Sequence, residues 1–319
     1  MNKTYDEQYI ELANKILSEC KWDNPEFVRT KYADGTPATT ISILNQKIEF
    51  DNSKDSALLT SKKVATKDPI TEILWIWQDM SNDVNLLESK DCTVWNEWKR
   101  EDGTIGKSYG WQLANKKRKV KVDKLFIDMS KSNQFSVSPD FTEHDWNELY
   151  KDIEESNEDI YVHLNQVDYL LYGLKKNPYS RRIKTTLYSI EDLDDMALEP
   201  CVYETHWQLW DNKLHLTVNI RSNDYCLGNS YNVYQYSVLH KMIAQVSGLE
   251  VGTICFNMDN LHVYDRHVNT LKEQINGELH EQPIVKLNPN IKSFYDFKPE
   301  DVIIENYENN GRFKYEVAE

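Results

Sequence analysis

Apolar residues follow helical and alternating patterns along most of the 319-residue chain. Near the N-terminus, Tyr9, Ala13, Ile16 and Leu17 recur at helical spacing, which predicts an amphipathic helix. Residues 38–50 instead alternate between apolar and polar positions and favour β-branched types, which predicts strands. The first part of the chain is therefore expected to combine a helix with extended segments.

The dipeptide Asp68-Pro69 predicts the start of a second helix. Aspartate is a good N-cap, and proline suits the first helical position because its missing N–H has no partner there anyway. Ile73, Trp77 and Met80 then fall near one face of the segment. We therefore expect a helix from Asp68 through Met80.

The second half of the chain mixes both patterns. Helices are predicted over residues 166–176 and 231–247, the latter stopped by Gly248, and strands over 181–190, 202–210, 213–221 and 253–258. Asp211-Asn212 joins the central two strands and predicts a hairpin turn. Because helices do not separate the strands regularly, the fold class is predicted to be α+β.

Residues 114–165 differ from the rest in composition, and we interpret them as an insertion in a single domain spanning residues 1–319. The basic run KKRKVKVDK lies at 116–124, and a polar, increasingly acidic stretch follows, with a helix expected around Asp145 to Glu155. A solvated edge or hairpin is favoured for the basic run. A nucleic-acid role is disfavoured, because the chain carries a net charge of -15.

The composition narrows the class of protein. At 40% hydrophobic residues the chain can bury one large core, and it contains neither an apolar run long enough for a membrane helix nor a signal-peptide pattern. Its five cysteines are an odd number without CxxC spacing, which favours the reducing cytoplasm, that of the host cell if a phage encodes the chain. The eight histidines lack metal-ligand spacing, so no metal is expected.

Cys201, which directly precedes a predicted strand, is the candidate nucleophile. On its own a cysteine is more often a buried apolar residue. Four arginines could bind a phosphate and supply the positive field that a thiolate needs, although a single arginine usually forms a surface ion pair. These arginines are Arg29, Arg181, Arg182 and Arg221.

Eight sequence motifs follow one another in the order that is typical of one enzyme superfamily. They are EILWIWQ, VWNEW, DGTIGKSYGWQ, NPYSRR, MALEPCVYETHW, RSNDYCLGNSYN, HVY and YDF. The chain thereby resembles the thymidylate synthase superfamily over nearly its whole length outside the insertion. VRTKYADGTPATTISI and RSNDYCLGN are most similar to the shorter synthases of bacilli and their phages. The resemblance implies a homodimer with a large mixed or antiparallel sheet at the interface.

The resemblance also implies roles for individual residues. Cys201 would attack carbon 6 of dUMP, Glu72 would organise water and move protons, and Tyr109 would help remove the carbon 5 proton. 5,10-Methylenetetrahydrofolate would be the co-substrate, bound by Trp95, Trp98 and Asp224. Arg181 and Arg182 would reach across from the other subunit. The implied nucleotide-binding residues are Arg29, Arg181, Arg182, Arg221, Ser222, Asn232, His262 and Tyr264.

Several departures from the synthase pattern point to a different product. Tyr188 replaces the usual tryptophan, Asn260 replaces an aspartate, and Glu319 replaces an apolar C-terminal residue. These features are similar to phage dCMP hydroxymethylases, whereas Asn232 suits uracil rather than cytosine. We therefore predict a dUMP hydroxymethylase. Thymidylate synthesis is the alternative, and a noncatalytic nucleotide- or RNA-binding relative is a remote one that retention of Cys201 and Glu72 argues against.

Overall fold

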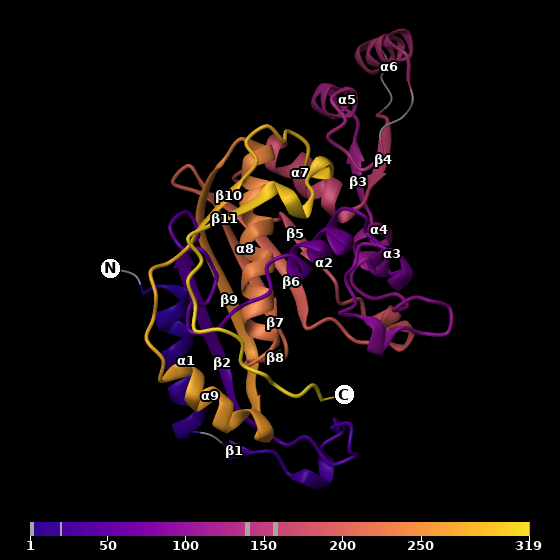
Figure 1. Cartoon of the computed structure of the whole chain (residues 1–319). Helices are drawn as coiled ribbons and strands as arrows, with labels where there is room; N and C mark the ends of the chain where they lie inside the picture. Colours follow the sequence, from indigo (N-terminus) through magenta and orange to yellow (C-terminus); the bar gives the residue numbers. More distant parts are fainter. Residues whose placement is uncertain (1–2, 20, 138–140, 156–158, 319) are drawn as a thin grey trace.

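The computed structural model describes residues 3–318, apart from residues 20, 138–140 and 156–158. At the centre of this described part lies a seven-stranded sheet in the order β1-β2-β9-β7-β6-β5, with β8 beside β9 (Figure 1). Its strands are β1 Lys21–Trp22, β2 Thr40–Asp51, β5 Lys184–Thr186, β6 Val202–Trp210, β7 Lys213–Ile220, β8 Asn223–Asp224 and β9 Glu250–Tyr264.

The sheet is mixed. β9 runs parallel to β7 and β8, while the other neighbouring strands pair antiparallel. The predicted hairpin is confirmed: β6 and β7 are joined by Asp211 and Asn212, whose φ angles are 51° and 59°. Two positive φ angles match the twist of paired strands, which is why Asp and Asn suit this turn. The predicted α+β class is confirmed as well.

Helices cover one face of this sheet. α8 runs along it, and α2 packs on α8 (Figure 1). Trp207 of β6 lies between them, with ring centroids 6.1 Å from Trp77 of α2 and 6.0 Å from His240 of α8. These aromatic contacts hold the helices and sheet in one core. Apart from two helices in the segment interpreted as an insertion, the α-helices of the described residues are α1 Tyr5–Glu19, α2 Asp68–Trp77, α3 Val84–Glu88, α4 Gly110–Asn115, α7 Gln166–Lys176, α8 Gly228–Ser247 and α9 Val268–Ile275.

Several smaller elements complete the chain. A second antiparallel pair is formed by β10 Ile284–Leu287 and β11 Val302–Glu305. The 3-10 helices are η1 Pro25–Phe27, η2 Asn96–Trp98, η3 Ile190–Asp195, η4 Asp265–His267, η5 Phe294–Asp296 and η6 Pro299–Asp301. Within the described residues, no helix has both the length and the apolar character to cross a membrane.

Among the residues that the structure describes, the opposite face of the sheet is left uncovered. Along β7, side chains alternate strictly between buried and half-exposed positions. The half-exposed side chains are polar and bond across strands: the Asn219 amide donates to the Glu204 carboxylate at 2.9 Å, and the Asn257 amide donates to Asn219 at 2.9 Å. Trp210 at the end of β6 remains 76% exposed. This face is therefore ordered, yet open to a partner.

The segment interpreted as an insertion contains β3 Arg118–Lys121, α5 Lys124–Lys131, α6 Glu143–Glu155 and β4 Tyr161–Leu164. It projects from one end of the molecule (Figure 1). β3 carries part of the basic run and pairs antiparallel with β4. Because α5 and α6 lie between these two strands in the chain, the pair is not a hairpin. Most side chains of β3 are exposed, which agrees with the alternative expectation of a solvated edge. The helix expected around Asp145 is also confirmed. The limits of the insertion stay a prediction.

Three local expectations were wrong. Asp68 is the first helical residue rather than the N-cap, because Lys67 before it already has αR angles, and α2 ends at Trp77, short of Met80. The strand expected over 181–190 shrinks to β5, since η3 begins at Ile190. Lys116 and Gln112 bond the Asp192 carboxylate and hold that turn.

Candidate active site

Cys201 sits at the last position before β6, as the sequence predicts. Its carbonyl accepts a hydrogen bond from the Arg221 amide at 2.9 Å. The Arg221 guanidinium donates to the carbonyls of Pro200 at 3.1 Å and Glu199 at 2.7 Å. Burial raises the pKa of the Cys201 thiol, and the positive charge of Arg221 opposes that rise. The arginine thus both fixes the cysteine loop and favours the thiolate.

Tyr109 touches the same cysteine. Its hydroxyl accepts a hydrogen bond from the Cys201 amide at 3.0 Å. Tyr109 has φ 43° and ψ -105°, a conformation that costs a non-glycine residue free energy. Gly110 follows it, and a Cβ at Gly110 would lie 2.3 Å from the Ser81 carbonyl oxygen. Close packing of this turn therefore holds Tyr109 in an unfavourable backbone conformation beside Cys201.

Glu72 is a buried carboxyl on α2. It accepts hydrogen bonds from the Trp95 indole at 2.6 Å and from the Gln235 amide at 2.5 Å. Burial raises the pKa of Glu72 to about 7, although these two donors oppose the shift. A carboxyl with such a pKa can both donate and accept a proton near neutral pH.

Hydrogen bonds link Glu72 to Asn232. Gln235 bonds Glu72 through its amide nitrogen, and its amide oxygen accepts from Asn232 at 3.3 Å. The Asn232 oxygen in turn accepts from Asn223 at 3.4 Å. The sequence prediction missed Gln235 and Asn223. Gln235 lies three residues after Asn232, a spacing that places both on one face of a helix, and this was the available signal.

Aromatic rings connect the Cys201 side of the site with the buried Glu72. The Trp95 ring lies 5.1 Å from that of Tyr109 and 5.5 Å from that of Trp98. Because Trp95 also donates to Glu72, one chain of contacts runs from Cys201 through Tyr109 and Trp95 to the buried carboxyl. Trp98 is half-buried and offers an aromatic surface beside this chain.

A polar cavity of about 500 Å³ lies on the other side of Arg221. Five of the predicted nucleotide residues line it together: Arg29, Arg221, Ser222, His262 and Tyr264. Further lining residues that the sequence did not indicate include Asp23, Thr30 and Thr40, and Asn260, noted above only as a departure, also lines it. Two arginines, hydroxyls and an imidazole in one hollow suit a phosphorylated sugar.

Inside this cavity, His262 is fixed by its neighbours. Its Nδ1 lies 3.0 Å from the Asn260 amide oxygen, and its ring meets that of Tyr264 edge-on at 5.5 Å. Burial lowers the pKa of His262, which favours the neutral imidazole. With Nδ1 donating to Asn260, Nε2 remains as an acceptor.

Asp224 lies between the cavity and α8. One oxygen of its carboxylate accepts from the amides of Cys226 at 2.9 Å and Leu227 at 3.2 Å. These bonds hold the turn that leads into α8, which carries Asn232. The Asp224 carboxylate is thus ordered by the backbone at the edge of the site.

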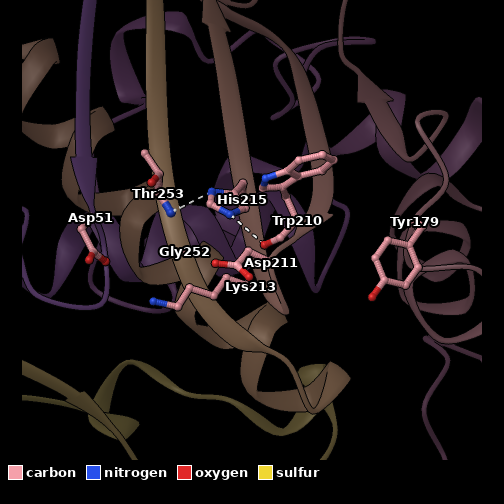
Figure 2. Close-up of a pocket in the computed structure, with 8 residues that line it drawn as sticks. All are labelled: Asp51, Tyr179, Trp210, Asp211, Lys213, His215, Gly252 and Thr253. Atoms are coloured by element: carbon pink, nitrogen blue, oxygen red, sulfur yellow. Dashed lines mark hydrogen bonds between the residues drawn. The ribbon is translucent and has the colours of Figure 1, made fainter.

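Arg181 and Arg182 are exposed and are not among the residues that line this cavity. Arg181 lines a separate hollow together with Tyr179 and Trp210 at the hairpin end of the sheet. Figure 2 shows the neighbouring hollow of about 560 Å³, in which His215 lies 3.2 Å from the Trp210 carbonyl and accepts from the Thr253 amide at 3.1 Å. Arg181 therefore lies beside Trp210, which belongs to the uncovered face of the sheet.

Two further expectations concern cysteines and metals. Cys92, Cys201, Cys226 and Cys255 are free thiols, and Cys20 lies outside the described residues. Among the residues that the structure describes, no three histidine, cysteine, aspartate or glutamate side chains gather where they could hold a metal ion.

Comparison with known proteins shows which family has this sequence and fold. The family model described as thymidylate synthase matches residues 7–319. The chain belongs to the thymidylate synthase family. It is 43% identical to the thymidylate synthase of Bacillus mojavensis over 315 residues, which cover 98% of this chain and 99% of that protein. It is 42% identical to the thymidylate synthase of Bacillus phage phi3T, with the same coverage.

A solved structure of a thymidylate synthase supports the same family assignment. The thermostable thymidylate synthase A from Bacillus subtilis matches with a TM-score of 0.82 and 42% identity, covering 99% of this chain and 100% of that one. The predicted superfamily and the thymidylate synthase fold are thus confirmed. The finer prediction of a hydroxymethylase finds no support among these relatives, which are named thymidylate synthases.

Proposed function

We propose that this protein is a thymidylate synthase, which converts dUMP and 5,10-methylenetetrahydrofolate to dTMP and dihydrofolate. The observation that carries the proposal is the cavity shared by Arg29, Arg221, Ser222, His262 and Tyr264 beside the cysteine loop. The near-complete alignment with proteins named thymidylate synthase supports methylation over the hydroxymethylation that the sequence departures suggested.

In this proposal the cavity binds the nucleotide. Arg29, Arg221 and Ser222 take the phosphate, and the free Nε2 of His262 accepts from a ribose hydroxyl beside Tyr264. Asn232 pairs with uracil, because an amide offers one donor and one acceptor to the ring N–H and carbonyl. Its own bonds to Gln235 and Asn223 hold that amide in one orientation.

Cys201 then attacks carbon 6 of the ring. The new S–C bond pushes the carbon 5–carbon 6 electron pair toward the carbonyl at carbon 4, so that carbon 5 becomes nucleophilic. When bound, methylenetetrahydrofolate supplies the one-carbon unit and the hydride. Glu72, with a pKa of about 7, exchanges protons with the ring through its polar neighbours. Tyr109, whose hydroxyl already contacts the Cys201 amide, is placed to help remove the carbon 5 proton.

The folate would lie against the aromatic surface of the half-buried Trp98, with the buried Trp95 meeting that ring edge-on behind it and next to Tyr109. A fused pterin ring suits such a surface because it buries a flat apolar area. Asp224, held by two backbone amides, offers a carboxylate to the ring's N–H groups. The chemistry of these side chains fits the co-substrate.

We propose further that the protein is a homodimer that pairs through the uncovered face of the sheet. The exposed Trp210 and the ordered polar ladder of Glu204, Asn219 and Asn257 support this surface as the interface. Arg181 lies beside Trp210, and Arg182 follows it as a second exposed arginine, so we propose that both reach the phosphate site of the partner subunit.

Hydroxymethylation is the second candidate, and two departures favour it. Asn260 bonds His262 within the cavity, and Tyr188 donates to the Glu199 carboxylate at 2.7 Å. Because the Glu199 carbonyl anchors Arg221, both departures contact the nucleotide side of the site. The third departure, Glu319, lies outside the described residues. A noncatalytic relative remains the least supported alternative, since Cys201, Glu72 and Asn232 are all retained.

Mass analysis of the nucleotide product tests the proposal. Incubation with dUMP and methylenetetrahydrofolate is expected to yield dTMP, and Cys201→Ser serves as the control that should yield none. Hydroxymethyl-dUMP as the main product would favour the second candidate. No conversion, together with no dUMP-dependent exchange of the carbon 5 hydrogen, would favour the noncatalytic relative.

A further inference from the structure

A short loop supplies one wall of the nucleotide cavity. Its ends, Arg29 with Thr30 and Ala38, line the hollow, while its tip turns at Gly35 with φ 82°. Two backbone bonds close the loop as a narrow hairpin: the Tyr32 amide to the Thr36 carbonyl at 3.0 Å, and the Ala38 amide to the Thr30 carbonyl at 2.9 Å. Because the loop is closed on itself, displacing its tip also displaces Arg29.

The C-terminal segment docks close by. The Tyr315 side chain is buried, and its hydroxyl donates to the Gln274 amide oxygen at 2.6 Å. Nε2 of His267 lies 2.7 Å from the Glu316 carbonyl oxygen. The segment around Tyr315 and Glu316 is therefore held by α9 and η4, which directly follow the cavity strand β9.

Arg266 of η4 bonds both segments at once. Its Nη2 donates to Asp34 Oδ2 at 2.7 Å and to Thr36 Oγ1 at 2.6 Å in the loop. Its Nη1 donates to both oxygens of Glu316 in the tail, at 2.9 and 3.1 Å. The guanidinium also lies over the Tyr32 ring, 3.9 Å from its centroid.

The shape of the guanidinium makes these bonds interdependent. Its donors form a rigid plane, so they cannot be reoriented one at a time. The plane rests on Tyr32, and the Tyr32 hydroxyl in turn donates to Asp265, the residue before Arg266. Losing Glu316 removes two of the bonds that fix the orientation of this plane, which is expected to weaken its hold on Asp34 and Thr36.

We propose that Arg266 is a positioning residue that couples docking of the C-terminal segment to the loop carrying Arg29. Its effect on nucleotide affinity rests on the proposed function, because Arg29 is taken to bind the phosphate of dUMP. The coupling itself depends only on contacts within the chain. By linkage, occupation of the cavity should stabilise the docked tail as much as the docked tail stabilises the loop.

Amide hydrogen exchange tests the coupling without any ligand. Made in the wild-type protein, Glu316→Ala is expected to speed exchange of the amides in residues 30–38. Made in the Arg266→Ala variant, the same substitution is expected to cause no further increase. Lys286→Ala is the control, because it breaks an exposed ion pair with Glu305 between β10 and β11, away from the loop. An unchanged loop in Glu316→Ala, or an equal increase in both backgrounds, overturns the proposal.

Binding of dUMP tests the consequence for the site. Each exposed ion pair is worth little, so Arg266→Ala and Glu316→Ala should each weaken dUMP binding by about two- to five-fold, and the double variant should be no weaker than Arg266→Ala. Additive losses, or wild-type affinity in Arg266→Ala, overturn the link to Arg29. If the wild type fails to bind dUMP, the proposed function fails, and the exchange experiment still decides the coupling.

Discussion

Glu72→Gln is the substitution whose effect follows most directly from the structure. It keeps the shape of the side chain but removes its ionisation. The carboxyl has an ordinary pKa of 4.5 and a pKa of about 7 in the folded protein, mainly because it is buried. Glutamine also presents one acceptor oxygen where Trp95 and Gln235 both donate, so one donor loses its partner.

The sign of the pH effect follows from proton binding. Between pH 4.5 and 7 the folded protein keeps the Glu72 proton, while the unfolded chain releases it. The stabilising contribution is therefore full below pH 4.5 and is lost as pH rises through about 7. At 1.36 kcal/mol per unit, the loss amounts to about 3 kcal/mol. Glu72→Gln does not titrate and lacks this contribution.

Urea unfolding at one protein concentration measures the difference. The wild-type advantage over Glu72→Gln should be about 3 kcal/mol smaller at pH 8 than at pH 4.5. Groups common to both proteins cancel in this comparison. Glu101→Gln, which removes an exposed carboxyl from a turn, isolates the part due to burial. A wild-type advantage that does not change with pH would refute the reasoning, because Glu72 would then ionise alike in both states.

The remaining predictions concern the site directly. Cys201→Ser should still bind dUMP but lose turnover by about 10³-fold or more, because a hydroxyl ionises far less than a thiol; near wild-type rates would remove Cys201 from the reaction. Asn232→Asp should reduce the preference for dUMP over dCMP by about 5- to 150-fold, equal to 1–3 kcal/mol for a lost buried hydrogen bond; an unchanged ratio would contradict base reading by Asn232. Mixing Cys201→Ser with Arg182→Ala subunits should restore activity, because one site of the hybrid dimer is then intact; hybrids that form but stay inactive would place Arg182 in its own subunit's site.

The sequence predicted the long periodic elements well. The helix over 166–176 and the hairpin at Asp211-Asn212 follow from patterns that span many residues or demand one turn geometry. The start of α2 and the end of β5 were wrong because such boundaries depend on tertiary contacts, such as those that hold Asp192. Local pattern carries no information about these partners.

For the site, ordered motifs indicated residues but not their connections. Arg29, Arg221, Ser222, His262 and Tyr264 do share one cavity. Gln235 was missed: its spacing from Asn232 places both on one helix face, but only the packing of α8 against α2 shows that Gln235 reaches Glu72. The contacts of Arg266 with Asp34 and Glu316 likewise join residues that are 232 and 50 positions apart along the chain.

The nucleotide product could not be predicted from the sequence motifs alone. Tyr188 and Asn260 suggested a hydroxymethylase, whereas the full-length similarity to thymidylate synthases favours methylation. The structure shows both departures contacting the nucleotide side of the site, through Glu199 and His262 respectively. Neither contact determines whether a hydride or water reaches the exocyclic carbon.

The stoichiometry of dihydrofolate to consumed dUMP tests the central claim most directly. Hydride transfer oxidises the folate, whereas addition of water leaves it as tetrahydrofolate. The dihydrofolate absorbance should therefore rise in step with the loss of dUMP, and the nucleotide formed should be dTMP. Consumption of dUMP with release of tetrahydrofolate and no dihydrofolate would contradict the account and make the protein a hydroxymethylase.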